Sequence, residues 1–216
     1  MVAIGCTGGI GSGKSTVAAL LERRGARIVD ADAISHAVIA PGTPGRNAVV
    51  ARFGARILGP DGAIDRRTLA ALVFADIVAR RDLEAIVHPL VDAIVRQELA
   101  SSAEGEVVVC VLPLLVETDA RRRYRLDGVL VVDAPEDLVI ERLVRDRNMD
   151  ETEVRARIAA QADRFARLAL ADYVILNVGT LEELDEMSGG AWRWIEQLGH
   201  GSAAVTRGQG GAPLGS

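Results

Sequence analysis

The sequence predicts an α/β fold with a doubly wound parallel sheet of about five strands. Two observations lead to this prediction. Short, β-branched apolar runs alternate with helical patterns along the chain, and the first run is followed by a glycine-rich loop and a helix. The expected strands cover residues 2–6, 27–29, 106–112, 128–132 and 173–176.

The loop after the first strand predicts a phosphate site. Residues 8–16 match the pattern G-x-x-x-x-G-K-[ST] and lie between a strand and a helix expected at about 15–24. Glycines let backbone N–H groups converge on an anion, and the helix adds the positive end of its dipole. We therefore expect ATP to bind at residues Gly11, Ser12, Gly13, Lys14, Ser15 and Thr16.

Two side chains of this loop have specific expected roles. Lys14 is the only lysine in a chain with 25 Lys and Arg residues, and it should reach the β- and γ-phosphates as a catalytic residue. The Ser15 hydroxyl is placed to coordinate Mg²⁺, a cation that prefers oxygen ligands and bridges phosphates. A chance glycine turn is the alternative that we set aside.

A pair of carboxylates ends the second expected strand. In a doubly wound sheet the carboxyl ends of neighbouring strands point into one crevice, so Asp30 and Asp32 should lie near the phosphates. Either could orient an acceptor hydroxyl and take its proton, and we favour Asp32 as the base. The structural alternative is that one of them caps the next helix.

The long connection between the second and third strands exceeds what one crossover helix requires. It contains helical patterns at about 46–53, 66–77 and 89–100, and we expect a helical insertion, at about 33–103, that caps a second substrate. A charged stretch at about 142–168 is a candidate helical lid over the nucleotide. Together these segments make one domain, 1–198, followed by a glycine-rich tail, 199–216, that we expect to be disordered.

The composition of the chain limits the binding partners and the cellular location that we expect. The net charge of −5 comes without a basic block, so we expect no nucleic-acid partner. The longest apolar run, 107–116, is too short to span a bilayer, so we expect no membrane partner and a cytoplasmic location. Cys6 and Cys110 both lie in strand-like runs and should be buried thiols. A monomer and a small homo-oligomer both remain open.

Several motifs in order resemble the bacterial dephospho-coenzyme A kinases, over about residues 2–194. The family pattern appears in the segments 5–16, 30–32 with Ile34, 41–43, 61–66 with Leu69 and Phe74, 87–89, 113–117, 142–143, 157–158 with Gln161, and 171–172 with Asn177. The resemblance implies a P-loop kinase-like fold. It also implies transfer of the γ-phosphate of ATP to the ribose 3′-hydroxyl of dephospho-coenzyme A, with Mg²⁺.

The resemblance also suggests roles for residues outside the loop. Asp32 is similar to the residue that engages the acceptor hydroxyl, Arg142 to a lid arginine near the transferring phosphoryl, and Asn177 to residues that border the adenine. The chain departs from the family at His36, where Arg is common, and at Val139, where Gln is frequent.

Two further residues are candidates for substrate binding, each with an alternative. His88 has the chemistry of a catalytic group, but one His at a helix start is often a packing residue. Glu117 could contact substrate, bind the waters of Mg²⁺ or pair with an arginine. The run 121–125, rich in arginine, could meet the pyrophosphate of the acceptor or be a solvated surface.

Other functions share some of these features. A nucleoside monophosphate kinase would have the same loop, lid and sheet, and a non-catalytic nucleotide-binding protein would bind ATP without turnover. A GTP-binding switch requires an Asn-Lys-x-Asp motif, which a chain whose only lysine is Lys14 cannot contain.

Overall fold

The computed structural model describes residues 1–206, without the side chains of 201–206, and contains one five-stranded parallel sheet. The strand order is β2-β3-β1-β4-β5, so β1 is central. The predicted α/β fold is confirmed. The strands are β1 (Val2–Gly8), β2 (Arg27–Asp30), β3 (Val107–Val111), β4 (Gly128–Asp133) and β5 (Tyr173–Leu176).

The chain forms two compact units. Among the described residues, the first contains 1–29 and 102–206, and the second contains Asp30–Ser101. The helices of the first unit are α1 (Lys14–Glu22), α6 (Ala120–Arg123), α7 (Glu136–Arg147), α8 (Glu151–Ala159), α9 (Arg164–Ala169) and α10 (Leu181–Thr206).

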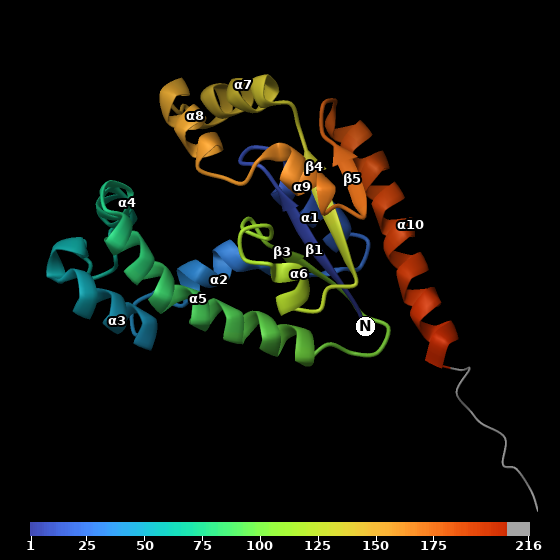
Figure 1. Ribbon diagram of the computed structural model, residues 1–216, viewed down its shortest axis with the longest axis horizontal. Coiled ribbons are helices and arrows are strands. Elements are labelled where there is room, and N and C mark those ends of the chain that lie inside the picture. The colour runs from blue at the N-terminus through green and yellow to red at the C-terminus, as the bar shows by residue number, and fades with distance from the viewer. Residues whose placement is uncertain (207–216) are drawn as a thin grey trace, which may run out of the picture. The chain divides into compact units, whose positions relative to one another are not determined.

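The core of the first unit lies between its sheet and the helices α1 and α10. Ile4 and Cys6 of β1 and Leu130 of β4 pack in it with apolar residues of both helices. Figure 1 shows α10 running alongside the sheet, where it contacts α1, β1 and β5. Cys6 and Cys110 are both buried free thiols, as predicted, and burial raises the pKa of Cys110 to about 12.

The second unit is helical and has its own core. Its elements are α2 (Ala31–Ala37), α3 (Pro44–Phe53), the 3-10 helix η1 (Ala55–Ile57), α4 (Arg66–Ala75) and α5 (Ile77–Ala100). Val49, Phe53, Ile57, Leu69 and Ala79 form the buried centre of this unit. The unit therefore has an apolar core of its own, as a compact subdomain needs.

Helix α5 is longer than the sequence predicts. We expected a helix at 89–100 that starts at the His88–Pro89 pair, whereas α5 begins at Ile77 and contains this pair in its interior. Asp76 caps the true start, because its side chain accepts hydrogen bonds from the N–H groups of Val78 and Ala79. Packing of the preceding turns against the core of the second unit offsets the missing N–H of Pro89.

The last helix also extends past its predicted end. We expected a tail from residue 199, but α10 continues to Thr206; the remaining residues, 207–216, lie outside the described residues. Gly199 fits this helix because a Cβ atom there would lie 3.2 Å from Val2 Cγ2, so a small residue lets α10 lie close to β1.

In the described part of the chain, no helix is both long enough and apolar enough to cross a bilayer.

Truncating the centre of the sheet should destabilise the first unit. Ile4 is 0% exposed, and Ile4→Ala should lower the free energy of unfolding by about 2–5 kcal/mol, because it removes buried methyl groups and leaves a cavity. Chemical denaturation measures this value. The control is Val174→Ala on β5, where the side chain is 43% exposed, and its expected cost is below about 1 kcal/mol. Equal losses would contradict the assigned core.

Candidate active site

The glycine loop connects β1 to α1 and needs glycine for close approach. A Cβ atom at Gly8 would lie 2.2 Å from the carbonyl oxygen of Val132 on the neighbouring strand β4. Gly13 has a φ of 99°, and a Cβ atom there would lie 2.3 Å from Asn177 Nδ2. Larger residues at these two positions would push the loop away from β4 and from the segment after β5.

Lys14 is the first residue of α1, and its ammonium lies over the loop. Lys14 Nζ donates hydrogen bonds to the carbonyl oxygens of Gly8, at 2.9 Å, and Gly9, at 2.8 Å. Ser15 and Thr16 follow in the first turn of the helix, where both are exposed. The loop residues predicted to hold ATP and Mg²⁺ thus lie at one helix N-terminus, which favours anions.

Asn177 joins the glycine loop to the predicted lid. The side chain is 7% exposed, and its Nδ2 donates to the carbonyl oxygen of Ser12 at 2.9 Å. The carbonyl oxygen of Asn177 accepts a hydrogen bond from Arg142 Nη1, on α7, at 3.0 Å. Three predicted site residues are therefore connected in one chain of contacts. The amide of Asn177 supports the loop itself, and its predicted place beside adenine stays a prediction.

An ion pair that sequence reasoning missed lies beside the loop. Asp133, buried at the end of β4, accepts hydrogen bonds from Arg164 Nε at 2.9 Å and 3.1 Å and from Arg164 Nη2. These bonds raise the pKa of the Arg164 guanidinium above its usual range. The sequence did contain a signal for Asp133, because it ends a strand next to β1 and ligands bind at the carboxyl ends of such strands. No comparable signal marked Arg164.

The turn between α8 and α9 is held by hydrogen bonds to the glycine loop, to Glu117 after β3 and to α9. Gln161 Oε1 accepts from the N–H of Ile10 at 2.9 Å. Glu117 Oε1 accepts from the N–H of Ala162 at 2.9 Å, and the carbonyl oxygen of Ala162 accepts from Arg167 Nη1. The described contact of Glu117 is thus with the backbone of this turn rather than with an arginine.

A cavity of about 320 Å³ lies between the loop and this turn. Gly9, Ser12 and Asp133 border it on the side of the sheet, and Arg164 and Arg167 border it from α9. Its lining combines backbone, hydroxyl and guanidinium groups with the carboxylates of Asp133, Glu136 and Asp163, which suits a polar ligand.

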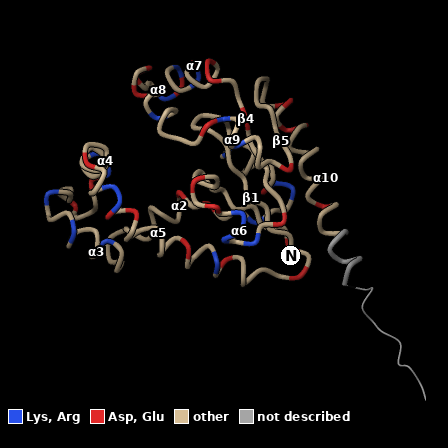
Figure 2. The backbone as a smooth tube through the Cα atoms, viewed as in Figure 1, with Lys and Arg blue, Asp and Glu red and all other residues tan. Residues whose placement is uncertain are grey.

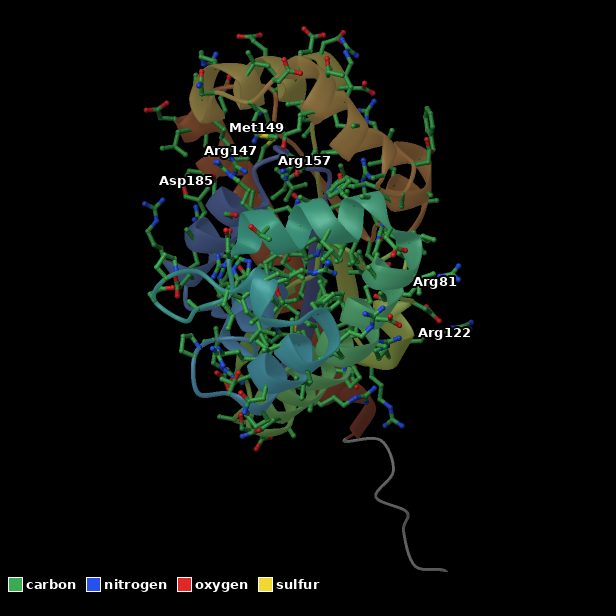
Figure 3. All side chains as sticks on the ribbon, turned by 90° about the vertical axis from the view of Figure 1, so that its left-hand side faces the viewer. Arg81, Arg122, Arg147, Met149, Arg157 and Asp185 are labelled. Atoms are coloured by element: carbon green, nitrogen blue, oxygen red, sulfur yellow. The ribbon has the colours of Figure 1, made fainter. Side chains whose placement is uncertain are left out.

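The charges of the helices beyond β4 are mostly paired along each helix. Figure 2 shows basic and acidic residues interspersed over α7 and α8. Three pairs have a spacing of four residues: Arg145 with Glu141, Arg155 with Glu151 and Arg157 with Glu153. Arg145 also pairs with Asp146, and Arg155 of α8 with Glu136 of α7. Such exposed pairs contribute little to stability or to ligand binding. Met149 packs with the apolar side of both helices (Figure 3).

Asp30, Asp32 and His88 belong to the second unit. Asp30 caps α2: its Oδ1 accepts from the N–H of Asp32 at 2.8 Å and of Ala33 at 3.3 Å. The capping alternative therefore applies to Asp30. Asp32 is exposed in the first turn of α2, and His88 is exposed on α5, which packs against α2.

The arginine-rich run after β3 divides into paired and solvent-facing members. Arg121 forms an ion pair with Asp172 at 2.9 Å. Figure 3 shows the Arg122 side chain pointing away from the fold.

In the described part of the chain, no group of three or more His, Cys, Asp and Glu side chains is arranged to hold a metal ion.

Comparison with known proteins identifies the family. The family model described as CoaE, Dephospho-CoA kinase, matches residues 2–183. The chain belongs to the dephospho-CoA kinase family. Its activity is that of a dephospho-CoA kinase, and the family implies ATP and dephospho-coenzyme A as the two substrates.

Similar proteins support membership in the dephospho-CoA kinase family. A dephospho-CoA kinase of Thermobifida fusca is 46% identical over 93% of this chain and 99% of its own length. One of Streptomyces avermitilis is 48% identical over 93% and 97%. The crystal structure of TT1252 from Thermus thermophilus is 35% identical, covers 89% of this chain and 97% of its own, and has a TM-score of 0.76.

Breaking the ion pair of Asp133 should loosen this kinase site. Asp133→Ala should lower the free energy of unfolding by roughly 1–3 kcal/mol, because the variant leaves Arg164 beside the loop without its carboxylate. Thermal and chemical denaturation measure the change. The control, Glu141→Ala, breaks an exposed pair with Arg145 and should have little effect. If Asp133→Ala left the free energy of unfolding unchanged, the ion pair would not be what holds α9 in place.

Proposed function

We propose that residues 11–16 bind the triphosphate of ATP and that Lys14 and Arg142 contact its phosphates during the transfer. The observation that carries this proposal is the position of Lys14, the only lysine of the chain, at the start of α1 with its ammonium over the glycine loop. A compact ammonium suits this narrow space between backbone carbonyls. Arg142 is close enough to the same loop to contact Asn177, which holds Ser12.

The reaction is an in-line transfer between two oxygens. The ribose 3′-oxygen of dephospho-coenzyme A forms a bond to the γ-phosphorus, and the bond from that phosphorus to the β,γ-bridging oxygen breaks, which releases ADP. The proton of the acceptor hydroxyl goes to the carboxylate of Asp32. Because the transition state is loose and spreads negative charge over the phosphoryl oxygens, Lys14 and Arg142 stabilise it electrostatically.

Magnesium fits the residues at the start of α1. The exposed Ser15 hydroxyl offers the oxygen ligand that Mg²⁺ prefers, beside the loop proposed to hold the phosphates. Bound there, Mg²⁺ would neutralise charge on the β- and γ-phosphates. The task of this chain is to direct the Ser15 hydroxyl and the loop N–H groups toward that point.

The second unit is proposed to bind dephospho-coenzyme A. Asp30 supports this task by capping α2, which fixes the backbone of Asp32. His88 lies on α5, the helix that packs against α2, so both candidate residues come from one rigid pair of helices. Glu117 contributes from the first unit by holding the turn between α8 and α9.

Two buried thiols and a substrate of central metabolism support a cytoplasmic location. Mg²⁺ and the two substrates are the proposed partners, and the chain is proposed to act without nucleic acid or membrane, as a monomer or a small homo-oligomer.

An acceptor panel tests the proposal directly. ADP release with ATP and Mg²⁺ is measured with dephospho-coenzyme A, AMP, CMP, adenosine and no acceptor. We expect turnover only with dephospho-coenzyme A, and none in the Lys14→Ala variant, because phosphate positioning is lost. Faster turnover with AMP or CMP would instead favour a nucleoside monophosphate kinase. ATP binding without any turnover would favour a binding protein.

The role of Asp32 is tested by a nearly isosteric change. Asp32→Asn should lower kcat by about 100- to 10,000-fold, because the acceptor hydroxyl loses its base, while the affinity for ATP changes little. The control is Asp76→Asn, which keeps a good N-cap on α5 and should retain full activity. Equal loss of ATP affinity in Asp32→Asn would assign Asp32 to nucleotide binding or to folding.

A further inference from the structure

Arg167 is a charged group that the proposed mechanism does not yet use. It lies on α9, it is half-buried, and its Nη1 donates to the carbonyl oxygen of Ala162. Its neighbour Arg164 is neutralised by Asp133. Within the part of the chain that the structure describes, Arg167 forms no ion pair. It therefore brings a guanidinium without a carboxylate partner to a cavity that Glu136 and Asp163 also border.

The other end of the Arg167 guanidinium lies against the glycine loop. Its Nη2 is 3.2 Å from the position that a Cβ atom would take at Gly9. Lys14 Nζ lies 2.8 Å from the carbonyl oxygen of the same Gly9. Two cations thus approach one residue of the loop. An anion bound beside Gly9 would therefore have two cationic side chains of this chain near the same residue.

The position of Arg167 is fixed by the contacts around the start of α9. Gln161 accepts from the N–H of Ile10, Glu117 accepts from the N–H of Ala162, and Arg164 is bound to Asp133. These bonds connect α9 to the glycine loop, to the segment after β3 and to the end of β4. An arginine held by a preorganised support loses little entropy when it binds a ligand.

The cavity beside Arg167 offers a second polar group without a partner. Ser12 lines this cavity, is 2% exposed, and its hydroxyl has no hydrogen-bond partner among the described residues. A buried hydroxyl without a partner costs free energy that a ligand with acceptor oxygens can recover. A phosphoryl group has such oxygens.

We propose that Arg167 is a further catalytic residue that binds the γ-phosphoryl group of ATP next to Gly9. The inference rests on the proposed function, in which Lys14 reaches the β- and γ-phosphates. Because Lys14 and Arg167 both lie against Gly9, the terminal phosphate is the part of ATP within reach of the two cations. Arg167 then stabilises the charge that spreads over the phosphoryl oxygens as the bond to ADP breaks.

The test compares nucleotides with and without a γ-phosphate. Equilibrium affinities for ADP and for the non-hydrolysable analogue adenylyl imidodiphosphate, both with Mg²⁺, are measured for the wild type and for Arg167→Ala. We expect the variant to bind the analogue roughly 10-fold more weakly, because a charge-assisted hydrogen bond is lost, and to bind ADP with unchanged affinity. We also expect kcat to fall by about 100-fold or more.

Two further variants keep the test decisive. Arg167→Lys keeps the charge but not the planar fork, so it should recover part of the affinity for the analogue, and it replaces Arg167→Ala if that variant does not fold. Arg193→Ala removes an exposed arginine of α10 and should match the wild type in every measurement.

The outcomes separate this inference from the proposed function. Equal losses for ADP and the analogue, or no loss for either, would overturn the role of Arg167. The binding measurements need no acceptor, so they judge Arg167 even if the acceptor panel rejects dephospho-coenzyme A. If dephospho-coenzyme A gives no turnover but Arg167→Ala still binds the analogue more weakly than the wild type, only the acceptor assignment is wrong.

Discussion

One constraint governs the first unit: in the proposed function the glycine loop keeps N–H groups available for phosphate, so its other polar backbone groups need partners from the protein. Asn177 donates to the carbonyl of Ser12, Gln161 accepts from the N–H of Ile10, and Lys14 donates to the carbonyls that precede it. Buried backbone groups without partners are costly, and a loop of small residues has few side chains with which to satisfy itself. The partners therefore come from the segment after β5, from the turn before α9 and from the start of α1.

The same contacts connect the predicted lid to the sheet. Arg142 on α7 binds the carbonyl of Asn177, whose side chain holds the loop, and Arg164 on α9 binds Asp133 at the end of β4. Most other charges of α7 and α8 are paired along their own helices. Arg142 and Arg164 thus differ from the other arginines of these helices, because their partners lie at the edge of the sheet. Exposed ion pairs along one helix contribute little to stability.

In the proposed function the two units have different tasks. The first unit would supply backbone and cationic groups for an anionic nucleotide, and the second carries Asp32 on a helix whose start is fixed by the cap of Asp30. A carboxylate that caps a helix is engaged by backbone N–H groups, so its neighbour is the better candidate for proton transfer. Each unit has its own apolar core, which lets each hold its residues rigidly.

The sequence by itself determined the sheet, the glycine loop and the family, because strands, glycine turns and helix starts depend on residues close together in the chain. It also indicated Lys14, Ser15 and the two aspartates. Only the tertiary structure decided the partners of Asp133, Gln161 and Arg167, which come from segments far apart in the sequence. It also decided the length of α5, since packing against the core of the second unit outweighs the local effect of a proline.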